Sequence, residues 1–553
     1  MCIRDSSNTA QNLDGGLSNS YIIGGSSWSS NTTSGTTIQG STSATINLNG
    51  ITLSGTEEHN SFVKTIIGGS YGNVNNAGTV NNINGDTSVS IIGREGITFT
   101  GDIIGGSFEN SGQAQYTIGG KSSISISGGS TFTGNIYGGS YSKVPGNTGS
   151  TMTTAGNITV ELGTGTYRGN IYGAGNKGTA GGDVLVSLTG GSVFRAEGEQ
   201  SGITIGGSAG AAVEGNRTLE LKGTFGDGDF QNVTFTRFDE INIAQEGSSA
   251  TIWALTDSPS LTKTGAGTLA LGYAGNTLAH LTVEEGTLAF TGGATIGVNP
   301  NNATIVRVSE GASLALSGGT VNLHAQLNGA GTVTIGTADT AGLVNISNTG
   351  NTNFTGRLEL VGNGVNMNTN ANWVAFGAGN TLGGGTVFID GKGFHFSAGT
   401  TAANFEIGAT HGAMQNGSSG ATYTFSGNLS GSGTWAMAAN VRMNNVLTGS
   451  LKDFSGTLST NETSSNNNRQ AWNFGSGGVC ATGEGNSVFG DGAILGGNTG
   501  STDTGLAAQY NVNYNNTELV LNALVQGNSS LTHAGTGTLI LDKANTATGC
   551  LLY

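Results

Sequence analysis

Apolar residues alternate with polar ones in short runs through most of this chain. In the first half, an apolar residue or pair runs directly into two small residues six times. The first small residue falls at positions 24, 68, 105, 138, 173 and 206, so the steps are 44, 37, 33, 35 and 33 residues. Such a period predicts stacked repeats, because one unit cannot bury its own apolar face without its neighbours. The six copies are Ile22–Gly25, Ile66–Gly69, Ile103–Gly106, Ile136–Gly139, Ile171–Ala174 and Thr204–Gly207.

Each of these repeats contains two or three short strands separated by glycine-rich corners. Residues 124–127, for example, alternate Ile-Ser-Ile-Ser, and Phe132 and the next apolar pair at Ile136 follow. A period of two is typical of half-buried strands, and glycine supplies the positive φ that a tight corner needs. Equivalent positions of successive copies carry the same kind of residue, which favours a parallel β-helix over a meandering sheet. Ile103, Ile136 and Ile171 should then lie one above another, about 4.8 Å apart, inside a dry core.

A second array with a different period begins near residue 251. The run Leu261–Leu271 (LTKTGAGTLAL) returns at residues 531–541, and shortened forms begin at Leu327 and Leu429. The steps from 327 to 429 and from 429 to 531 are both 102 residues. Other landmarks recur at nearly this distance, namely Phe354 with Phe454, and Trp373 and Phe376-Gly377 with Trp472 and Phe474-Gly475. We therefore assign residues 7–250 to an array of 33–44-residue Ile-Gly-Gly repeats and residues 251–549 to an array with a module of about 100 residues.

The residues at the two ends of the chain do not follow the repeat pattern. Residues 1–6 and 550–553 resemble translated sequencing-adaptor sequence at the ends of a metagenomic fragment, so we interpret them as a non-native leader and a non-native tail. Of the three cysteines, Cys2 and Cys550 lie in these segments, and Cys480 alone gives no disulfide framework. The start carries no signal-peptide pattern, and no apolar run reaches the length of about 18 residues that a membrane helix needs.

Composition and charge narrow the class of protein. Glycine accounts for 100 of 553 residues, but it follows no Gly-X-Y period and only 3 prolines occur, which excludes collagen. Charged residues make up 10%, and the net charge is −15 with 19 Lys and Arg and no basic run. Binding to nucleic acid or to an anionic membrane is therefore not expected.

The run Leu261–Leu271, followed by Asn276-Thr277 and the strand pattern of residues 281–288, resembles the autotransporter-associated β-strand repeat. Residues 531–549 resemble a second copy without its closing half. The resemblance implies the passenger domain of a bacterial autotransporter, an all-β, right-handed parallel β-helix (β-solenoid) and elongated repeat protein. Such passengers are exported through a C-terminal outer-membrane β-barrel. Neither that barrel nor a signal peptide is recognisable in this sequence, which we attribute to truncation.

Candidate chemistry is sparse. The densest charged patch holds four carboxylates with Arg237 among them: Asp227, Asp229, Asp239 and Glu240. Paired carboxylates could bind calcium or cleave glycosidic bonds, but Gly226-Asp227-Gly228-Asp229 is also an ordinary turn sequence, and we favour the turn. No two of the six histidines lie within five residues of each other, and we expect His395 to be a solvated strand residue. We predict no catalytic, cofactor-binding or metal-binding residues.

These observations predict a fragment of a secreted or cell-surface autotransporter passenger stalk, which acts in adhesion or surface display and is not an enzyme. Expected partners are glycans or host and cell-surface proteins, met by many weak contacts of the exposed Ser, Thr and Asn faces and of tyrosines such as Tyr71 and Tyr141. The expected location is extracellular, at the bacterial surface. One alternative is a self-assembling surface-layer or matrix protein. Another is a carbohydrate-active β-helix enzyme, which would need three or more charged groups converging on one face over adjacent coils.

Overall fold

The described residues of the computed structural model form two compact units, Met1–Thr277 and Leu278–Tyr553, and we take each unit by itself. The change of repeat placed after residue 250 lies inside the first unit, and the three cysteines lie outside the described residues. The structure describes residues 3–4, 10–11, 21–28, 35–49, 61–62, 64–72, 78–110, 113–144, 151–195, 202–247, 249–252, 254–272, 275–297, 304–336, 344–346, 351–362, 373–376, 383–396, 399–416, 421–437, 443–461, 470–474, 488–498, 507–513, 518–549 and 551–552.

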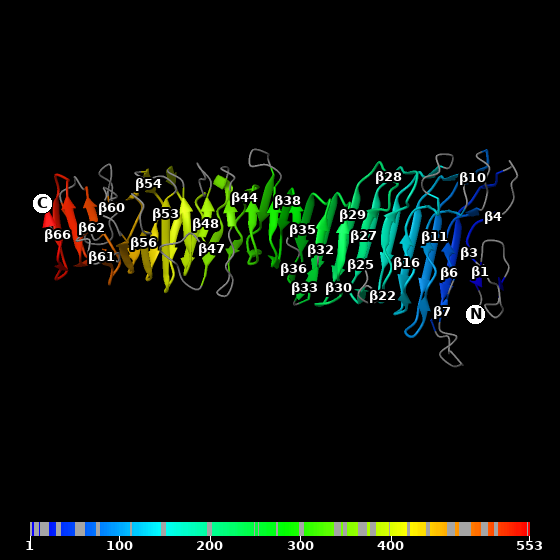
Figure 1. Cartoon of the computed structure of the whole chain (residues 1–553), viewed down its shortest axis with the longest axis horizontal. Helices are drawn as coiled ribbons and strands as arrows, with labels where there is room; N and C mark the ends of the chain where they lie inside the picture. The colour runs from blue at the N-terminus through cyan, green and yellow to red at the C-terminus, as the bar shows by residue number, and fades with distance from the viewer. Residues whose placement is uncertain are drawn as a thin grey trace. The chain divides into compact units, whose positions relative to one another are not determined.

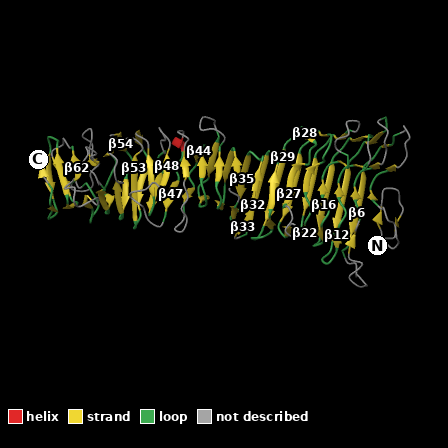
Figure 2. Cartoon of the chain, viewed as in Figure 1, coloured by secondary structure: helices red, strands yellow, loops and turns green. Residues whose placement is uncertain are grey.

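Both units are all-β, with parallel strands in stacked sheets (Figure 2). Within the described residues, one short 3-10 turn, η2 (Asn351–Asn353), accompanies the strands, and no helix is long and apolar enough to cross a membrane. Strands of one coil pair with the equivalent strands of the next coil, as a parallel β-helix requires (Figure 1). The predicted fold class is therefore confirmed, while the handedness of the coil stays a prediction.

In the first unit, each of the first four coils passes through five sheets in a fixed order. The isoleucine sheet contains β3 (Ile22–Ile23), β8 (Ile66–Ile67), β13 (Ile103–Ile104), β18 (Ile136–Tyr137), β23 (Ile171–Ala174), β27 (Ile203–Ser208), β31 (Val233–Thr236) and β34 (Ala254–Thr256). The corner sheet contains β4 (Ser27–Trp28), β9 (Tyr71–Gly72), β14 (Phe108–Glu109) and β19 (Tyr141–Ser142). The connecting sheet contains β5 (Thr37–Ile38), β10 (Val80–Ile83), β15 (Gln115–Ile118), β20 (Met152–Thr154), β24 (Thr179–Ala180) and β28 (Ala212–Val213).

Two further sheets complete the coil. The long sheet contains β6 (Thr42–Asn47), β11 (Thr87–Ile92), β16 (Ser122–Ser127), β21 (Ile158–Leu162), β25 (Val184–Thr189), β29 (Arg217–Gly223), β32 (Glu240–Gln245) and β35 (Ser260–Thr264). The aromatic sheet contains β7 (Ser61–Phe62), β12 (Thr98–Phe99), β17 (Thr131–Phe132), β22 (Gly165–Tyr167), β26 (Ser192–Arg195) and β30 (Phe230–Gln231). The antiparallel strands β1 (Ile3–Arg4) and β2 (Ala10–Gln11) extend the long sheet beyond β6. Outside these five sheets, β33 (Ser249–Ile252) pairs with β36 (Thr268–Leu271).

The apolar ladder predicted for this unit is present. Ile103 pairs with Ile136, and Ile136 pairs with Ile171, in parallel register. Each of the three is at most 1% exposed. On the aromatic sheet, inward rings stack in the same way, with centroids 5.0 to 5.4 Å apart from one ring to the next along Phe99, Phe132, Tyr167, Phe194 and Phe230.

The sequence alignment of the sixth copy is wrong by one residue. Ile171 pairs with Ile205 rather than Thr204, so this step is 34 residues and not 33. Thr204 lies beside Asn170 instead, and its backbone N–H donates to Asn170 Oδ1 at 2.8 Å. The register follows the side chain that fills the core, because slipping a strand by one residue would turn its apolar set outward. Later coils shorten further, since Ile205 pairs with Phe235 and Phe235 with Leu255.

The repeated glycines are required where the isoleucine sheet meets the corner sheet. A Cβ built on Gly68 would lie 2.4 Å from the carbonyl oxygen of Gly105, and one built on Gly105 would lie 2.3 Å from that of Gly138. Neither glycine has a positive φ, so the constraint is close contact between the backbones of successive coils rather than turn geometry. A column of glycines therefore sets how closely the coils approach at this corner.

A buried column of serines follows the glycines. The backbone N–H of Ser70 donates to Ser107 Oγ at 3.1 Å, and that of Ser107 donates to Ser140 Oγ at 3.0 Å. All three serines are buried. Each hydroxyl thus satisfies a backbone donor of the preceding coil, which a buried corner would otherwise leave unpaired.

Most coils of the second unit pass through three sheets. One contains β38 (His280–Val283), β41 (Ile305–Val308) and β44 (Gln326–Asn328). A second, the clamp sheet, contains β39 (Thr287–Phe290), β42 (Ser313–Leu316), β45 (Thr332–Ile335), β47 (Arg357–Val361), β49 (Thr386–Asp390), β52 (Asn404–Ile407), β55 (Leu429–Gly431) and β58 (Asp453–Phe454).

The other sheets of this unit hold its remaining strands. The third contains β40 (Ala294–Ile296), β43 (Val321–Leu323), β46 (Val344–Ile346), β48 (Trp373–Phe376), β50 (Gly393–Phe396), β53 (His411–Asn416), β56 (Thr434–Met437), β59 (Thr457–Thr460), β61 (Ile494–Asn498), β64 (Leu524–Gly527) and β67 (Thr546–Ala547). Beside them lie β51 (Gly399–Thr401), β54 (Ala421–Phe425), β57 (Met443–Leu447), β60 (Gln470–Phe474), β62 (Ala508–Val512), β65 (Ser529–His533) and β68 (Leu551–Leu552), and the pair β63 (Glu518–Leu521) and β66 (Thr538–Leu541). Strand β37 (Asn276–Leu278) lies at the division between the units.

The landmarks of the 102-residue module have equivalent local pairing. Gly329 bridges to Phe354 and Gly431 pairs with Phe454, and both glycines have a φ of +99°. The two copies nevertheless fall in different sheets, because β44 belongs to the sheet of β38 and β41 whereas β55 belongs to the clamp sheet. The module therefore does not correspond to a whole number of coils. Gly377 and Gly475 lie outside the described residues.

The inward ladder makes a direct prediction. Ile136→Asp should lower the free energy of unfolding by several kcal/mol, because a charge without a partner enters an apolar core. Ile92→Asp makes the same chemical change at an isoleucine that is 38% exposed, and it should change stability little. Urea titration of both variants measures the difference. Equal midpoints for the two variants would contradict the assigned register.

The glycine column makes a second prediction. Gly105→Ala should lower the free energy of unfolding by about 1–3 kcal/mol, because the added methyl group meets the Gly138 carbonyl and forces two coils apart. Gly40→Ala is the matched control, since a Cβ at Gly40 meets nothing within 4 Å. Thermal and urea unfolding should separate the two. A stable Gly105→Ala protein would show that close backbone contact is not what requires glycine here.

Candidate functional site

The acidic patch singled out in the sequence is dispersed in the structure. Residues 227–229 form a turn with Gly228 at a φ of +91°, as predicted. Asp229 closes this turn by accepting a hydrogen bond from the Gly226 backbone N–H at 2.6 Å. The exposed Asp227 accepts one from the Thr251 hydroxyl at 3.0 Å. These two carboxylates therefore hold local structure.

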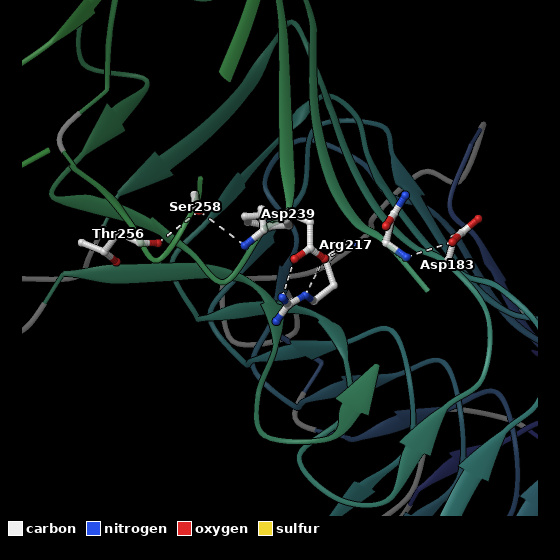
Figure 3. Close-up of polar contacts among 7 residues, drawn as sticks. Asp183, Arg217, Asp239, Thr256 and Ser258 are labelled. Carbon is white, nitrogen blue, oxygen red and sulfur yellow. Dashed lines mark hydrogen bonds and ion pairs between the residues drawn. The ribbon is translucent and has the colours of Figure 1, made fainter. Parts of the chain in front are cut away.

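Asp239 forms a bidentate ion pair with Arg217 of β29, as Figure 3 shows. Arg217 Nη2 donates to Asp239 Oδ1 at 2.6 Å, and both Nε and the backbone N–H of Arg217 donate to Oδ2 at 2.9 Å. These hydrogen bonds hold the pKa of Asp239 below its usual range and raise the pKa of Arg217. The pair fixes the start of β32 against the preceding coil. Arg237, two residues earlier, is exposed and takes no part in it.

A second series of polar side chains links the coils where the isoleucine sheet begins. Asp102 Oδ1 accepts from the Asn135 backbone N–H at 2.8 Å, and Asn135 Oδ1 accepts from the Asn170 N–H at 2.9 Å. Burial raises the pKa of Asp102, although the hydrogen bonds from Asn135 oppose this shift. The carboxylate thus occupies a position at which the next two coils carry a neutral amide.

A partly exposed aromatic cluster lies on the opposite side of the isoleucine sheet from the Ile103 ladder. Because successive side chains of a strand alternate, Ile104 and Tyr137 point away from the core that Ile103 and Ile136 fill, and rings of the corner sheet pack against them. We call the rings Tyr21, Tyr71, Phe108, Tyr137, Tyr141 and Tyr172 the tyrosine cluster.

The cluster extends over successive coils. Tyr21 stacks on Tyr71 and Tyr137 stacks on Tyr141, each with centroids 4.3 Å apart, and Tyr137 stacks on Tyr172 at 5.6 Å. Burial raises the pKa of Tyr71 to about 12, so its phenol stays neutral at physiological pH. Tyr71 and Tyr141 were expected as exposed contact residues, and both are half-buried in this cluster instead.

A fully buried carboxylate lies behind the cluster. Glu109 is 0% exposed, and the Tyr116 hydroxyl donates to its Oε2 at 2.6 Å. Burial and the negative charge of Glu109 raise the pKa of Tyr116, which keeps the proton on the phenol as the donor. Gly72 pairs with Glu109, and a Cβ at Gly72 would lie 2.9 Å from Glu109 Oε2. The glycine therefore leaves room for the polar pair inside the coil.

In the second unit, three charged groups converge on the outer face of the clamp sheet. Arg357 Nε donates to Glu359 Oε1 at 2.9 Å, and its Nη1 donates to Glu406 Oε2 at 2.7 Å. The guanidinium carbon lies 4.5 Å from the ring centroid of Phe388, and the Thr334 hydroxyl donates to Glu359 Oε2 at 3.1 Å. We call these residues the arginine clamp.

The arginine clamp joins four coils, because Thr334 pairs with Glu359, Glu359 with Phe388 and Phe388 with Glu406. Burial opposes the charge on Arg357, but hydrogen bonds to the two carboxylates outweigh it and raise the pKa of the guanidinium. A general acid or base needs a carboxyl group that can exchange protons with a substrate. Both carboxyl groups here accept hydrogen bonds from the same cation, so the geometry supports a structural clamp.

Sequence reasoning missed the arginine clamp. Alternation in residues 357–360 does place Arg357 and Glu359 outward, but the partner Glu406 lies two coils away. Leu358 pairs with Val387, 29 residues on, and Val387 pairs with Phe405, only 18 residues on. Coils of such unequal length give no periodic signal, so the match was not visible in the sequence.

The described residues contain no group of three or more His, Cys, Asp or Glu side chains arranged to hold a metal ion. The side chain of His395 lies outside the described residues, so its predicted outward position stays a prediction. Comparison with known proteins gave no match to a protein family, to a curated protein or to a solved structure.

The two carboxylates with shifted pKa values, Asp102 and Asp239, should respond in opposite ways to amide substitution. Asp102→Asn should raise the melting temperature at pH 7, because the raised pKa of Asp102 means that its charge destabilises the folded state. Asp239→Asn should lower the melting temperature, because the depressed pKa of Asp239 means that its charge stabilises the folded state.

The pH dependence supplies the control. A carboxyl group whose pKa is higher in the folded state adds stability at pH values below its unfolded pKa, and this contribution is lost as the pH rises through the folded pKa. A carboxyl group whose pKa is lower in the folded state adds stability at pH values above its unfolded pKa, and this contribution is lost as the pH falls through the folded pKa. The Asp102→Asn difference should therefore shrink as the pH falls toward about 4, whereas the Asp239→Asn difference should shrink only as the pH falls below about 4. Melting curves between pH 3 and pH 7 test this. Changes of the same sign in both variants would refute the assignment.

Proposed function

We propose that this chain is part of a bacterial autotransporter passenger, displayed at the cell surface or secreted, and that it acts as a stalk in adhesion or display. The resemblance of residues 261–288 and 531–549 to the autotransporter-associated repeat supports the family. The stacked coils support the role, because a solenoid presents the same kinds of side chain again and again along its surface. Expected partners are glycans or cell-surface proteins.

The observation that carries this proposal is the pair of hydroxyl columns on the outer face of the long sheet. Parallel register aligns Ser43, Ser88, Ser123 and Thr159 in one column. A second column lies two residues further along each strand and consists of Thr45, Ser90 and Ser125. These side chains are exposed or half-buried, and they alternate with inward apolar residues. Repeated neutral hydroxyls suit many weak contacts, whose combined strength depends on multivalency.

Bead adhesion tests this role. Beads coated with the purified chain should be retained on a surface that carries cell-surface glycans, and retention should rise steeply with coating density. The triple variant Ser88→Ala, Ser123→Ala, Thr159→Ala should lower retention. The control Thr98→Ala, Thr131→Ala, Thr166→Ala removes a hydroxyl column from the aromatic sheet instead and should leave retention unchanged. No retention at any density would refute the adhesive role.

The size of the protein in solution distinguishes a stalk from the alternative, a self-assembling matrix protein. Once its ends are capped, a stalk should sediment as a monomer, whereas a matrix protein should polymerise as its concentration rises. Export tests the family proposal independently. Placed between a signal peptide and an autotransporter barrel in a Gram-negative host, the chain should become accessible to external protease. Retention inside the cell would count against a passenger.

A further inference from the structure

Four phenols of the tyrosine cluster form two close pairs. The ring centroids lie 4.3 Å apart in Tyr21 with Tyr71 and in Tyr137 with Tyr141, at an interplanar angle of 30° in each pair. Rings that repeat from coil to coil along the aromatic sheet lie 5.0 to 5.4 Å apart. The two tyrosine pairs are therefore closer than the repeat of the coils by itself brings aromatic side chains.

The hydroxyl groups of each pair meet as well. Burial and a hydrogen bond with Tyr21 raise the pKa of Tyr71. Burial, together with the charge of Tyr141 and a hydrogen bond with it, raises the pKa of Tyr137. Because the rings stack and their hydroxyls are hydrogen-bonded, the ring carbons next to the hydroxyls, the Cε atoms, are brought near each other in both pairs.

Phe108 separates the two pairs along the corner sheet. It pairs with Tyr71 of the preceding coil and with Tyr141 of the next one. Its ring centroid lies 5.7 Å from that of Tyr71 and 5.8 Å from that of Tyr141. The fifth phenol of the cluster, Tyr172, stacks on Tyr137 at the longer distance of 5.6 Å. Phenylalanine carries no hydroxyl, so chemistry that needs two phenols is confined to each pair.

The pairs are not sealed in the core. Tyr21, Tyr71 and Tyr141 are half-buried, and Tyr137 is 7% exposed. At least one phenol of each pair therefore reaches solvent, where it can lose an electron to a small oxidant and its proton to water. Half-buried rings can also tilt, which lets two Cε atoms approach each other.

We propose that Tyr21 with Tyr71, and Tyr137 with Tyr141, are sites of oxidative cross-linking to dityrosine by a peroxide acting through a one-electron oxidant. Each phenol of a pair gives up one electron and its hydroxyl proton and becomes a phenoxyl radical, whose unpaired electron is shared with the Cε atoms. The two radicals form one Cε–Cε bond, and the hydrogen of each bonded carbon moves to the phenoxyl oxygen. The two electrons and two protons released reduce one molecule of hydrogen peroxide to two of water.

The two links differ in what they hold together. Tyr21 directly precedes β3 of the first coil and Tyr71 lies in β9 of the second coil, so their link closes the chain between residues 21 and 71. Such a cross-link stabilises a protein by restricting its unfolded chain. The link between Tyr137 and Tyr141 lies within one coil and fastens the corner between two sheets. Neither depends on the adhesive function.

Photo-oxidation of the full chain with a ruthenium tris-bipyridine complex and persulfate, itself a peroxide, tests the proposal. The protein is kept dilute so that links form within one molecule. The blue fluorescence of dityrosine should appear while the chain still migrates as a monomer in denaturing electrophoresis. Mass spectrometry of a tryptic digest should find peptides joined through Tyr21 and Tyr71, and the loss of two hydrogen atoms from the peptide that holds Tyr137 and Tyr141.

The same reaction in concentrated urea is the control for the fold. Unfolding separates the rings, so both links should be lost there. Absence of dityrosine from the folded chain would overturn the proposal. Links that join other tyrosines instead, or the same two links at equal yield in urea, would overturn it as well.

Conservative variants test each pair by itself. Tyr71→Phe should abolish the first link and leave the second, and Tyr141→Phe should do the reverse. The control Tyr167→Phe alters a buried tyrosine that stacks between two phenylalanines and should leave both links intact. Phe108→Tyr should add links at position 108, because a phenol there contacts both pairs. A Tyr71→Phe protein that loses both links, or a Phe108→Tyr protein that gains none, would refute the assigned geometry.

Discussion

Parallel pairing of each strand with the equivalent strand of the next coil is the constraint on which the rest of this structure depends. Such pairing places like residues directly above one another, so any property of one position is repeated along a column. Ile103, Ile136 and Ile171 form a column in the core, and Phe99 and Phe132 begin another. Because each coil is too short to enclose a core by itself, its stability comes from contact with its neighbours.

The same constraint explains the glycines and serines of the corners. A position at which two backbones approach closely must be small in every coil, and hence glycine recurs as a column rather than as isolated turn residues. A backbone donor that is buried in one coil is buried in all of them, so a hydroxyl such as that of Ser107 is repeated to satisfy it. The Ile-Ile-Gly-Gly-Ser motif thus meets three requirements of one corner. Isoleucine fills the core, glycine allows close contact between successive backbones, and the serine hydroxyl accepts a hydrogen bond from a buried backbone N–H.

The columns are interrupted in two places. Gly206 pairs with Tyr172 and carries no side chain, so it ends the stacking of the tyrosine cluster. The arginine clamp of the second unit breaks the column rule in another way, since Arg357 reaches across three coils to Glu406. In both places the side chains are unlike their neighbours above and below.

The sequence by itself determined the strands, the glycine corners and the core ladder, because alternation and stacking leave their period in the order of residues. It also located the turn at residues 227–229 and the equivalence of Phe354 and Phe454. Only the tertiary structure decided which polar residues meet. Coils differ in length, so the register at Ile205 and the pairing of Arg357 with Glu406 depend on which side chains fill the core. Asp239 pairs with Arg217 rather than Arg237 for the same reason, since a distance along the chain does not fix a distance across the coils.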